Sequence, residues 1–243
     1  MAVNTTELVE QFKTDATRMG AVVYEAEDAE AARDYVLKLA QERGVKHAVK
    51  SKSALADELG LRGHLENAGI EVKETNLGEW ITQLAGERPG SAADKTIEQV
   101  AGLISQATGE ELAPDPQALL SAARRVLKQS CVQAGMGISG ADIGIAESGT
   151  LISISDEGND RLVAVLPLIH VTVFDCENLI PTMDEAIVRL RSLAEDNTGG
   201  KMPSYVTYIT GRNTTGDIRG ALMARAQGPE EEHIVLLGKA ESR

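Results

Sequence analysis

The sequence predicts an α/β protein with an open, largely parallel sheet, an antiparallel meander and flanking helices. Helices alternate with short apolar strands in the first half, and closely spaced strands joined by short polar turns fill much of the second half. The 243 residues are 42% hydrophobic and 25% charged, as is usual for a globular chain. We expect a single domain over residues 1–243, with a helix over residues 4–19 as an appendage.

The first half contains apolar runs of strand length and longer runs with helical periodicity. The predicted strands cover residues 21–24, 45–49 and 70–75. The predicted helices cover residues 28–43, a short stretch ending at 59, residues 94–106, and a longer helix that begins at Asp115 and Pro116. This strand-helix-strand order favours parallel pairing with right-handed crossovers.

The second half is predicted to hold most of the strands, and its short turns favour antiparallel pairing. The predicted strands cover residues 143–146, 150–155, 162–166, 171–174, 205–210 and 233–237. Between them, Thr182 and Glu185 have the spacing of a capping box and predict a helix start.

Charge and cysteine content exclude several classes of protein. The formal charge of −13 argues against a nucleic-acid surface, which needs clustered Lys and Arg. Cys131 and Cys176 lack the spacing of a zinc or iron–sulfur site, the histidines form no metal-binding motif, and we expect no metal site and no cofactor in this chain. The polar N-terminus and the lack of a long apolar run predict a cytoplasmic protein without a membrane span.

Four groups of polar residues stand at predicted strand ends, where a rigid scaffold presents side chains to ligands. The first is Lys50, Ser51, Lys52 and Ser53. Free backbone N–H groups, hydroxyls and ammonium groups there fit a phosphate or carboxylate, and they equally fit a solvated helix cap.

The second group is the turn formed by Glu147, Ser148, Gly149 and Thr150. A carboxylate there fits a nucleophile, a general base or a partner for a substrate hydroxyl, although a turn glutamate at a hairpin is more often merely solvated. No nucleophile elbow surrounds Ser148, which disfavours a hydrolase triad.

The third and fourth groups stand just before the next two predicted strands. Asn159 and Arg161 fit a fork for a carboxylate ligand, although neighbouring acidic residues fit that arginine equally well. His170 fits a proton-transfer group, and equally a core histidine bonded to a backbone carbonyl. Gly211 ends a later strand near the same edge of the sheet.

The segment GADIGIAESGTLISISDEGNDRLVAVLPLIHVTVFDCENLIPTMDEA resembles the LUD domain of the lactate utilization proteins B and C. The segments AVKSKSALADELGLRGHLENAGIEVKETNLGEWITQLAGERPG and TGGKMPSYVTYITGR are similar to the same family. The resemblance covers nearly the whole chain. The matched positions are Lys50 to Ser53, Gly140, Asp142, Glu147 to Thr150, Asn159, Arg161, Pro167, His170, Pro181, Thr182 and Gly211.

The resemblance implies the fold shared by ribose-5-phosphate isomerase and the coenzyme A transferases. It also implies a part in oxidising L-lactate, or a related 2-hydroxy acid, to pyruvate together with iron–sulfur proteins. Because this chain has two cysteines, the clusters are expected on partner subunits. Glu147 resembles, over three residues, the setting of the coenzyme A transferase glutamate.

Three functional hypotheses follow. In the first, a LUD subunit binds a small anion (lactate, pyruvate or a phosphate-bearing molecule) through Lys52 and Arg161, with Glu147 and His170 as polar or proton-transfer groups in the same pocket. In the second, the chain alone is an enzyme on a sugar phosphate or acyl-coenzyme A ester. In the third, it is a scaffold. Catalysis by this subunit and the formation of oligomers stay open.

Overall fold

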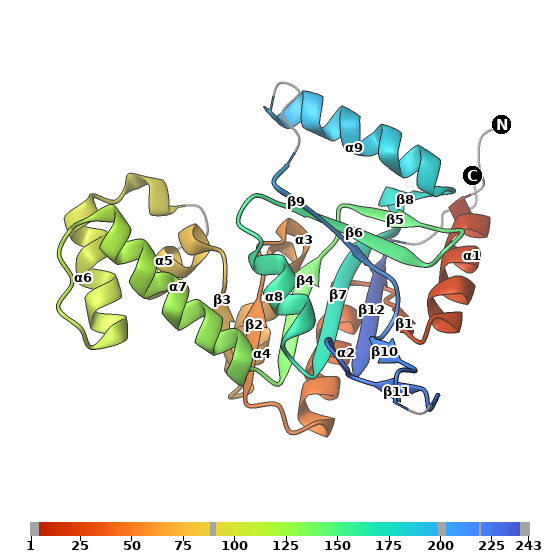
Figure 1. The fold of residues 1–243 in the computed structure, drawn as a ribbon, viewed down its shortest axis with the longest axis horizontal. Coiled ribbons are helices and arrows are strands. Elements are labelled where there is room, and N and C mark those ends of the chain that lie inside the picture. Colours follow the sequence, from red (N-terminus) through yellow and green to blue (C-terminus); the bar gives the residue numbers. More distant parts are fainter. Residues whose placement is uncertain (1–4, 88–90, 199–202, 219, 239–243) are drawn as a thin grey trace.

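A six-stranded parallel sheet forms the centre of the protein (Figure 1). The computed structural model describes residues 5–87, 91–198, 203–218 and 220–238. The strands, in spatial order, are β1 (Val22–Glu25), β12 (Glu231–Leu237), β7 (Ile169–Asp175), β4 (Met136–Gly140), β2 (His47–Lys50) and β3 (Glu71–Glu74). The first strand along the chain therefore pairs with the last, with Val22 opposite His233.

Helices cover both faces of this sheet, because its strands are apolar on both sides. One face carries α2 (Ala29–Glu42), α3 (Ala54–Glu58) and α4 (Leu61–Asn67). The other face carries α1 (Thr5–Arg18) and α8 (Asn159–Val165). Helix α8 approaches β4 closely at Gly137, where a Cβ atom would lie 2.0 Å from the carbonyl oxygen of Val163.

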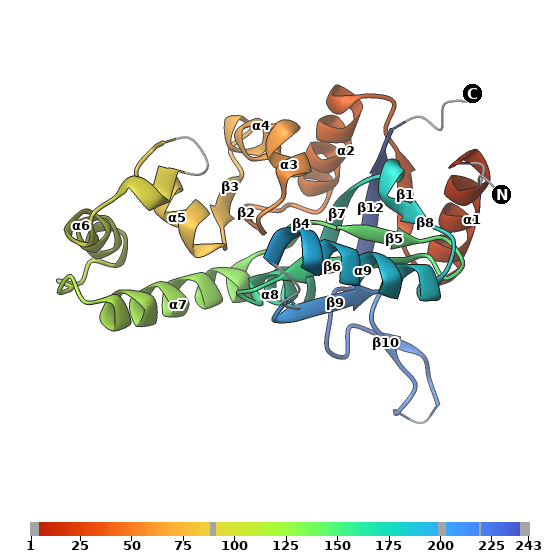
Figure 2. The same ribbon diagram turned by 90° about the horizontal axis from the view of Figure 1, so that it is seen from above.

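A second sheet of four strands lies beside the first, in the order β8 (Leu179–Ile180), β5 (Ile143–Ile145), β6 (Thr150–Ser155) and β9 (Tyr205–Ile209). Strand β6 pairs antiparallel with both β5 and β9, which makes the predicted meander. Helix α9 (Met183–Thr198) covers this sheet through Ala186 and Leu190 (Figures 1 and 2). The short helix η2 (Cys176–Asn178) links β7 to β8.

A helical lobe extends from the β3 edge of the central sheet (Figure 2). It contains α5 (Leu77–Leu84), η1 (Ser91–Asp94), α6 (Ile97–Thr108) and α7 (Pro116–Gln133), packed around the buried Trp80. Strands β10 (Thr214–Thr215) and β11 (Met223–Ala224) form a small antiparallel arm that projects away from the sheets (Figure 2). That the helical lobe and the sheets form a single domain stays a prediction.

Most predicted elements are confirmed, but two predictions in the second half are wrong. In the predicted strand 162–166, residues 162–165 belong to helix α8 and Leu166 is its C-cap, and β7 joins the central parallel sheet instead of the meander. The run LVAVL fits either state by periodicity, and Gly158, at a φ of 71°, lets the chain turn into the helix. Sequence reasoning also missed α4, α5 and the central strand β4.

Candidate functional site

A solvent-open cavity of about 800 Å³ lies at the carboxyl ends of β2, β4 and β7. Its lining includes residues at or just beyond the ends of these strands, among them Ser53, Gly140 and Asp175. Strand β6 and helix α9 form the opposite walls, where α9 contributes Arg189 and Leu190. Gly140 permits this arrangement because a Cβ atom there would lie 2.5 Å from the Ser53 hydroxyl.

The topology of the sheet explains why a cavity forms here. Strands β2 and β4 are neighbours, but the chain leaves β2 toward α3 on one face and reaches α8 on the other face after β4 and the β5–β6 hairpin. Connections that diverge from adjacent parallel strands open a crevice at their carboxyl ends. Ligands in open α/β sheets bind at such a point, so the cavity is the candidate site.

Two cations line the cavity without a hydrogen bond or ion pair to the rest of the described chain. Lys52 follows β2, and Arg189 projects from α9; both are exposed. An ammonium and a guanidinium group in one cavity suit a carboxylate or phosphate ligand. Arg189 was not predicted from the sequence, because an arginine on an amphipathic helix gives no signal of a site.

Asp142 and Asp160 also line the cavity, and burial raises the pKa of each carboxyl group. The charge of Asp160 raises the pKa of Asp142 further. Asp142 is nevertheless an exposed residue, so its raised pKa reflects protein packed around the carboxyl group at the cavity wall and not exclusion from solvent. Its Oδ2 accepts a hydrogen bond of 2.7 Å from the backbone N–H of Ile154.

Asp160 is 8% exposed and sits in the first turn of α8. Its Oδ2 accepts a hydrogen bond of 3.2 Å from the Ser153 hydroxyl, and Ser51 and Ser155 also bond to its carboxyl group. These hydroxyl donors lower its pKa, against the larger effect of burial. Ser51 therefore acts through Asp160 and is not itself part of the lining.

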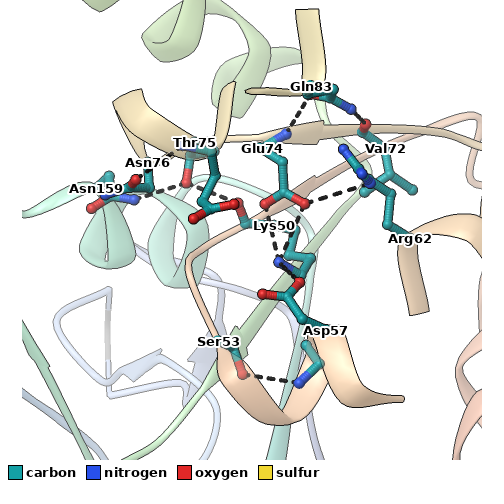
Figure 3. A network of polar contacts seen from close by, with 12 residues as sticks. Lys50, Ser53, Asp57, Arg62, Val72, Glu74, Thr75, Asn76, Gln83 and Asn159 are labelled. Carbon is teal, nitrogen blue, oxygen red and sulfur yellow. Dashed lines mark hydrogen bonds and ion pairs between the residues drawn. The ribbon is translucent and has the colours of Figure 1, made fainter. Parts of the chain in front are cut away.

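Asn159 lies in the cavity wall and is held by the end of β3. Its Nδ2 donates to the Thr75 hydroxyl at 3.0 Å, and that hydroxyl donates to the Lys50 carbonyl at 3.0 Å (Figure 3). Next to it, the Asn76 amide and the Leu77 backbone N–H donate to the carboxylate of Glu157, at 2.7 and 3.2 Å. The end of β3 thus fixes the cavity wall.

Lys50 is fully buried and lies outside the cavity lining, and its polar contacts are drawn in Figure 3. Its Nζ is 2.8 Å from Asp57 Oδ1 and 3.0 Å from Glu74 Oε2, and Arg62 approaches the same Glu74 at 3.7 Å. Burial raises the pKa of Glu74, against the effect of Lys50. We call these four residues the Lys50 network. Its lysine is fully occupied, so it holds the strand ends together.

His170 is a core residue. Its Nδ1 lies 2.9 Å from both carboxylate oxygens of Glu232, and its Nε2 lies 2.9 Å from the Ser139 hydroxyl. All three side chains are about 1% exposed or less, and none lines the cavity. His170 therefore links β4, β7 and β12; its partners are a carboxylate and a hydroxyl, where the sequence suggested a backbone carbonyl.

The turn from Glu147 to Thr150 serves the helices next to it. Oε1 of Glu147 accepts a 2.8 Å hydrogen bond from the first backbone N–H of α9, at Met183. The Ser148 hydroxyl bonds to that of Thr150, at 2.8 Å. Gly149 and Gly211 both have a φ of 63°; Gly149 lies against the backbone of Ala16 in α1, and Gly211 lies against the backbone of Met19, just after α1.

The structure therefore divides the predicted site residues. Lys52, Ser53 and Asn159 line the cavity, with Ser53 also capping α3. Arg161 is exposed and, like Glu147 and His170, lies outside the lining, so the expectation of one pocket for Lys52, Glu147, Arg161 and His170 is wrong. Arg161 has no partner among the described residues. Lys50, Ser51, Ser148, Gly149, Thr150 and Gly211 likewise lie outside the lining.

The cysteines do not fit an iron–sulfur cluster. Cys131 is buried in α7, and burial raises its pKa to about 11, far from the thiolate that a cluster needs. Cys176 belongs to a different hydrophobic cluster and donates to the Gly238 carbonyl at 3.1 Å. Within the described ranges, no three His, Cys, Asp or Glu residues gather in a metal-binding group. None of the helices in those ranges is long and apolar enough to cross a lipid bilayer.

Comparisons with known proteins agree with this fold. The chain is similar to proteins named lactate utilization protein B: it is 35% identical over 237 residues to that of Geobacillus thermodenitrificans (strain NG80-2) and 34% identical over 237 residues to that of Shouchella clausii (strain KSM-K16). Each alignment covers 96% of this chain and 48% of the relative, so the chain spans about half the length of these relatives.

The fold is also similar to that of a DUF162 family protein from Deinococcus radiodurans, known from a crystal structure. The TM-score is 0.53 at 14% identity, over 97% of this chain and 99% of the other. At that identity the likeness concerns the fold alone. The family model of the LUD domain matches residues 9–237. The chain belongs to the LUD domain family.

Proposed function

We propose that this LUD domain contributes to lactate utilization by binding a small carboxylate anion in the cavity between Lys52 and Arg189. The relatives named for lactate utilization support the pathway, although they are twice as long as this chain. The observation that carries the proposal is a cavity at the switch point of the sheet with two cations, Lys52 and Arg189, that have no partner among the described residues. L-Lactate, its product pyruvate and related 2-hydroxy acids are the proposed ligands.

The residues of the cavity suit the parts of a 2-hydroxy acid. Lys52 and Arg189 supply donors for its carboxylate. Asp142 and Asp160 supply acceptors for its hydroxyl group, and the amide of Asn159 can donate or accept. The volume of about 800 Å³ lies toward the upper end for ligand sites, so it also admits a larger phosphate-bearing anion.

The electron acceptor is proposed to lie on a partner protein. Oxidising a 2-hydroxy acid to a 2-oxo acid releases two electrons and two protons. Because Cys131 and Cys176 do not fit a cluster, iron–sulfur proteins that dock on this chain are the proposed acceptors. A cytoplasmic place of action stays a prediction.

Calorimetry with L-lactate, D-lactate, pyruvate and inorganic phosphate tests the ligand. We expect binding of L-lactate or pyruvate, and a loss of about tenfold or more in affinity for Lys52→Met and for Arg189→Met, which corresponds to about 1.4 kcal/mol. Lys46→Met is the matched control, since Lys46 is exposed and outside the cavity. Equal affinity in all three variants would exclude this cavity as the site.

Co-purification tests the partners. A tagged form of the chain, expressed in its natural host, should retain iron–sulfur proteins that can be recognised by their iron and sulfide content. Reduction of those clusters on addition of L-lactate, and not of D-lactate, would support the redox role. A chain that binds lactate but recovers no iron-containing partner would limit the proposal to ligand binding.

A further inference from the structure

The charge of the cavity poses a problem for an anionic ligand. Lys52 and Arg189 face six carboxylates in the lining, which are Glu58, Asp142, Asp156, Glu157, Asp160 and Asp175. An anion placed among ionised carboxylates is repelled by their negative charge. Binding is favourable only if part of this negative charge is removed.

Several of these carboxylates are fixed by backbone donors at the rim. Asp156 accepts a hydrogen bond from the backbone N–H of Ser204, and Asp175 accepts one from that of Glu177. Glu157 accepts from Asn76 and Leu77.

Asp142 and Asp160 also accept hydrogen bonds, but from neighbouring residues of β6, which hold them in one wall, and Asp160 is only 8% exposed. The backbone N–H of Ile154 donates to Oδ2 of Asp142, and the hydroxyl of Ser153 donates to Oδ2 of Asp160. Within the described residues, Oδ1 of Asp142 has no hydrogen-bond partner. Both carboxyl groups line the cavity, and the negative charge of Asp160 raises the pKa of Asp142.

We propose that the pair formed by Asp142 and Asp160 takes up one proton when an anion binds in this cavity. The proton converts one carboxylate into an O–H donor, so that the pair attracts the ligand instead of repelling it. The proton comes from solvent and no covalent bond of the ligand changes. The inference rests on the proposed function for the identity of the anion.

The other charged groups around the pair do not remove the need for this proton. Lys52, from the loop after β2, and Arg189, from α9, favour ionised carboxylates, but in the complex they are engaged by the ligand. Glu58 from α3, Asp175 from β7 and Asp156 with Glu157 before α8 all add negative charge. Burial already raises the pKa of both members of the pair, and a second anion beside them raises it further.

Calorimetry in two buffers tests the inference. Pyruvate is titrated into the protein in Mes and in imidazole at one pH, and the difference in apparent enthalpy gives the number of protons taken up. We expect close to one proton per pyruvate, and an affinity that falls by up to about tenfold for each unit of rising pH. In Asp142→Asn, which carries a neutral amide, uptake should vanish while pyruvate still binds.

Glu66→Gln is the matched control, because Glu66 is exposed and outside the cavity, and it should keep the uptake. Asp160→Asn provides a second variant if the first folds poorly. Pyruvate binding without proton uptake in the unmodified protein would overturn this inference and leave the proposed function intact. Absence of pyruvate and lactate binding at every pH would overturn both.

Discussion

Lys50 and Lys52 stand two residues apart and have opposite environments. Lys50 is fully buried and its ammonium group bonds to Asp57 and Glu74, whereas Lys52 is exposed in the cavity without a partner among the described residues. The sequence treats the two lysines alike, and the resemblance matches both. The comparison shows that a charged group at a strand end stabilises the fold when its partners come from the chain, and is free for a ligand when they do not.

The largest effect is expected from Lys50→Met. The substitution leaves Glu74 and Asp57 without their main counter-charge, and breaking a buried ion pair typically costs about 3–5 kcal/mol. Urea unfolding measures the loss. Lys52→Met should change the free energy of unfolding by less than about 0.5 kcal/mol, as a surface substitution does. Equal losses in the two variants would refute the contrast.

A smaller effect is expected from Thr75→Val. This nearly isosteric change removes the hydroxyl that donates to the Lys50 carbonyl and accepts from Asn159, at a cost of about 1–2 kcal/mol for two hydrogen bonds. Because Asn159 lines the cavity, ligand affinity should also fall. Thr75→Ser keeps the hydroxyl and should restore the affinity, which calorimetry would show. Unchanged ligand affinity in Thr75→Val would show that the hydrogen bonds at the end of β3 do not influence the cavity.

Glu147→Gln should have a still smaller effect. The amide oxygen can still accept the N–H of Met183, but the negative charge near the start of α9 is lost, at about 0.3–1 kcal/mol. Thermal unfolding measures this change. Ligand binding should be unaffected, because Glu147 lies outside the cavity. A variant that folds normally but loses a catalytic activity would instead support the hypothesis of Glu147 as base or nucleophile.

The smallest effect is expected from Asp142→Asn, as a change in how the free energy of unfolding depends on pH. Asp142 has a pKa raised by burial above its ordinary value of 3.8, so the folded state holds this proton more tightly than the unfolded state. Its contribution to stability is therefore largest below that ordinary value and declines as the pH rises through the raised pKa. Asp142→Asn should be more stable than the unmodified protein at neutral pH, with the difference vanishing in acid. Urea midpoints from pH 4 to 7 test this.

Fold and site were predictable to different degrees. Helix starts with local caps, such as Asp28 and Asp115, were readable because each cap bonds three residues ahead. Strand β4 was missed since its sequence, MGISG, carries glycines that suit close packing against α8 and weaken the strand signal. Missing β4 also hid Asp142, because the position of this aspartate beyond a strand end could not be recognised.

The candidate site depended on contacts between distant segments. The resemblance brought forward the motif around Glu147, but its role follows from α1 and α9, which lie far from it in the sequence. His170 was recognised as notable, yet its partner Glu232 is 62 residues away. Of Lys52, Glu147, Arg161 and His170, which the first hypothesis placed in one pocket, Lys52 lines the cavity. Its position was predictable because the end of a strand before a helix can be recognised from the local sequence.

The pairing of β1 with β12 bears on how the protein is made. As the ribosome delivers the chain from its N-terminus, β1 has no neighbour in the central sheet until residues 231–237 emerge. Until then one side of β7 also lacks its strand, and both edges are open to other chains. Such non-local closure slows folding and prolongs exposure to aggregation, so production of this protein should benefit from low temperature and from chaperones.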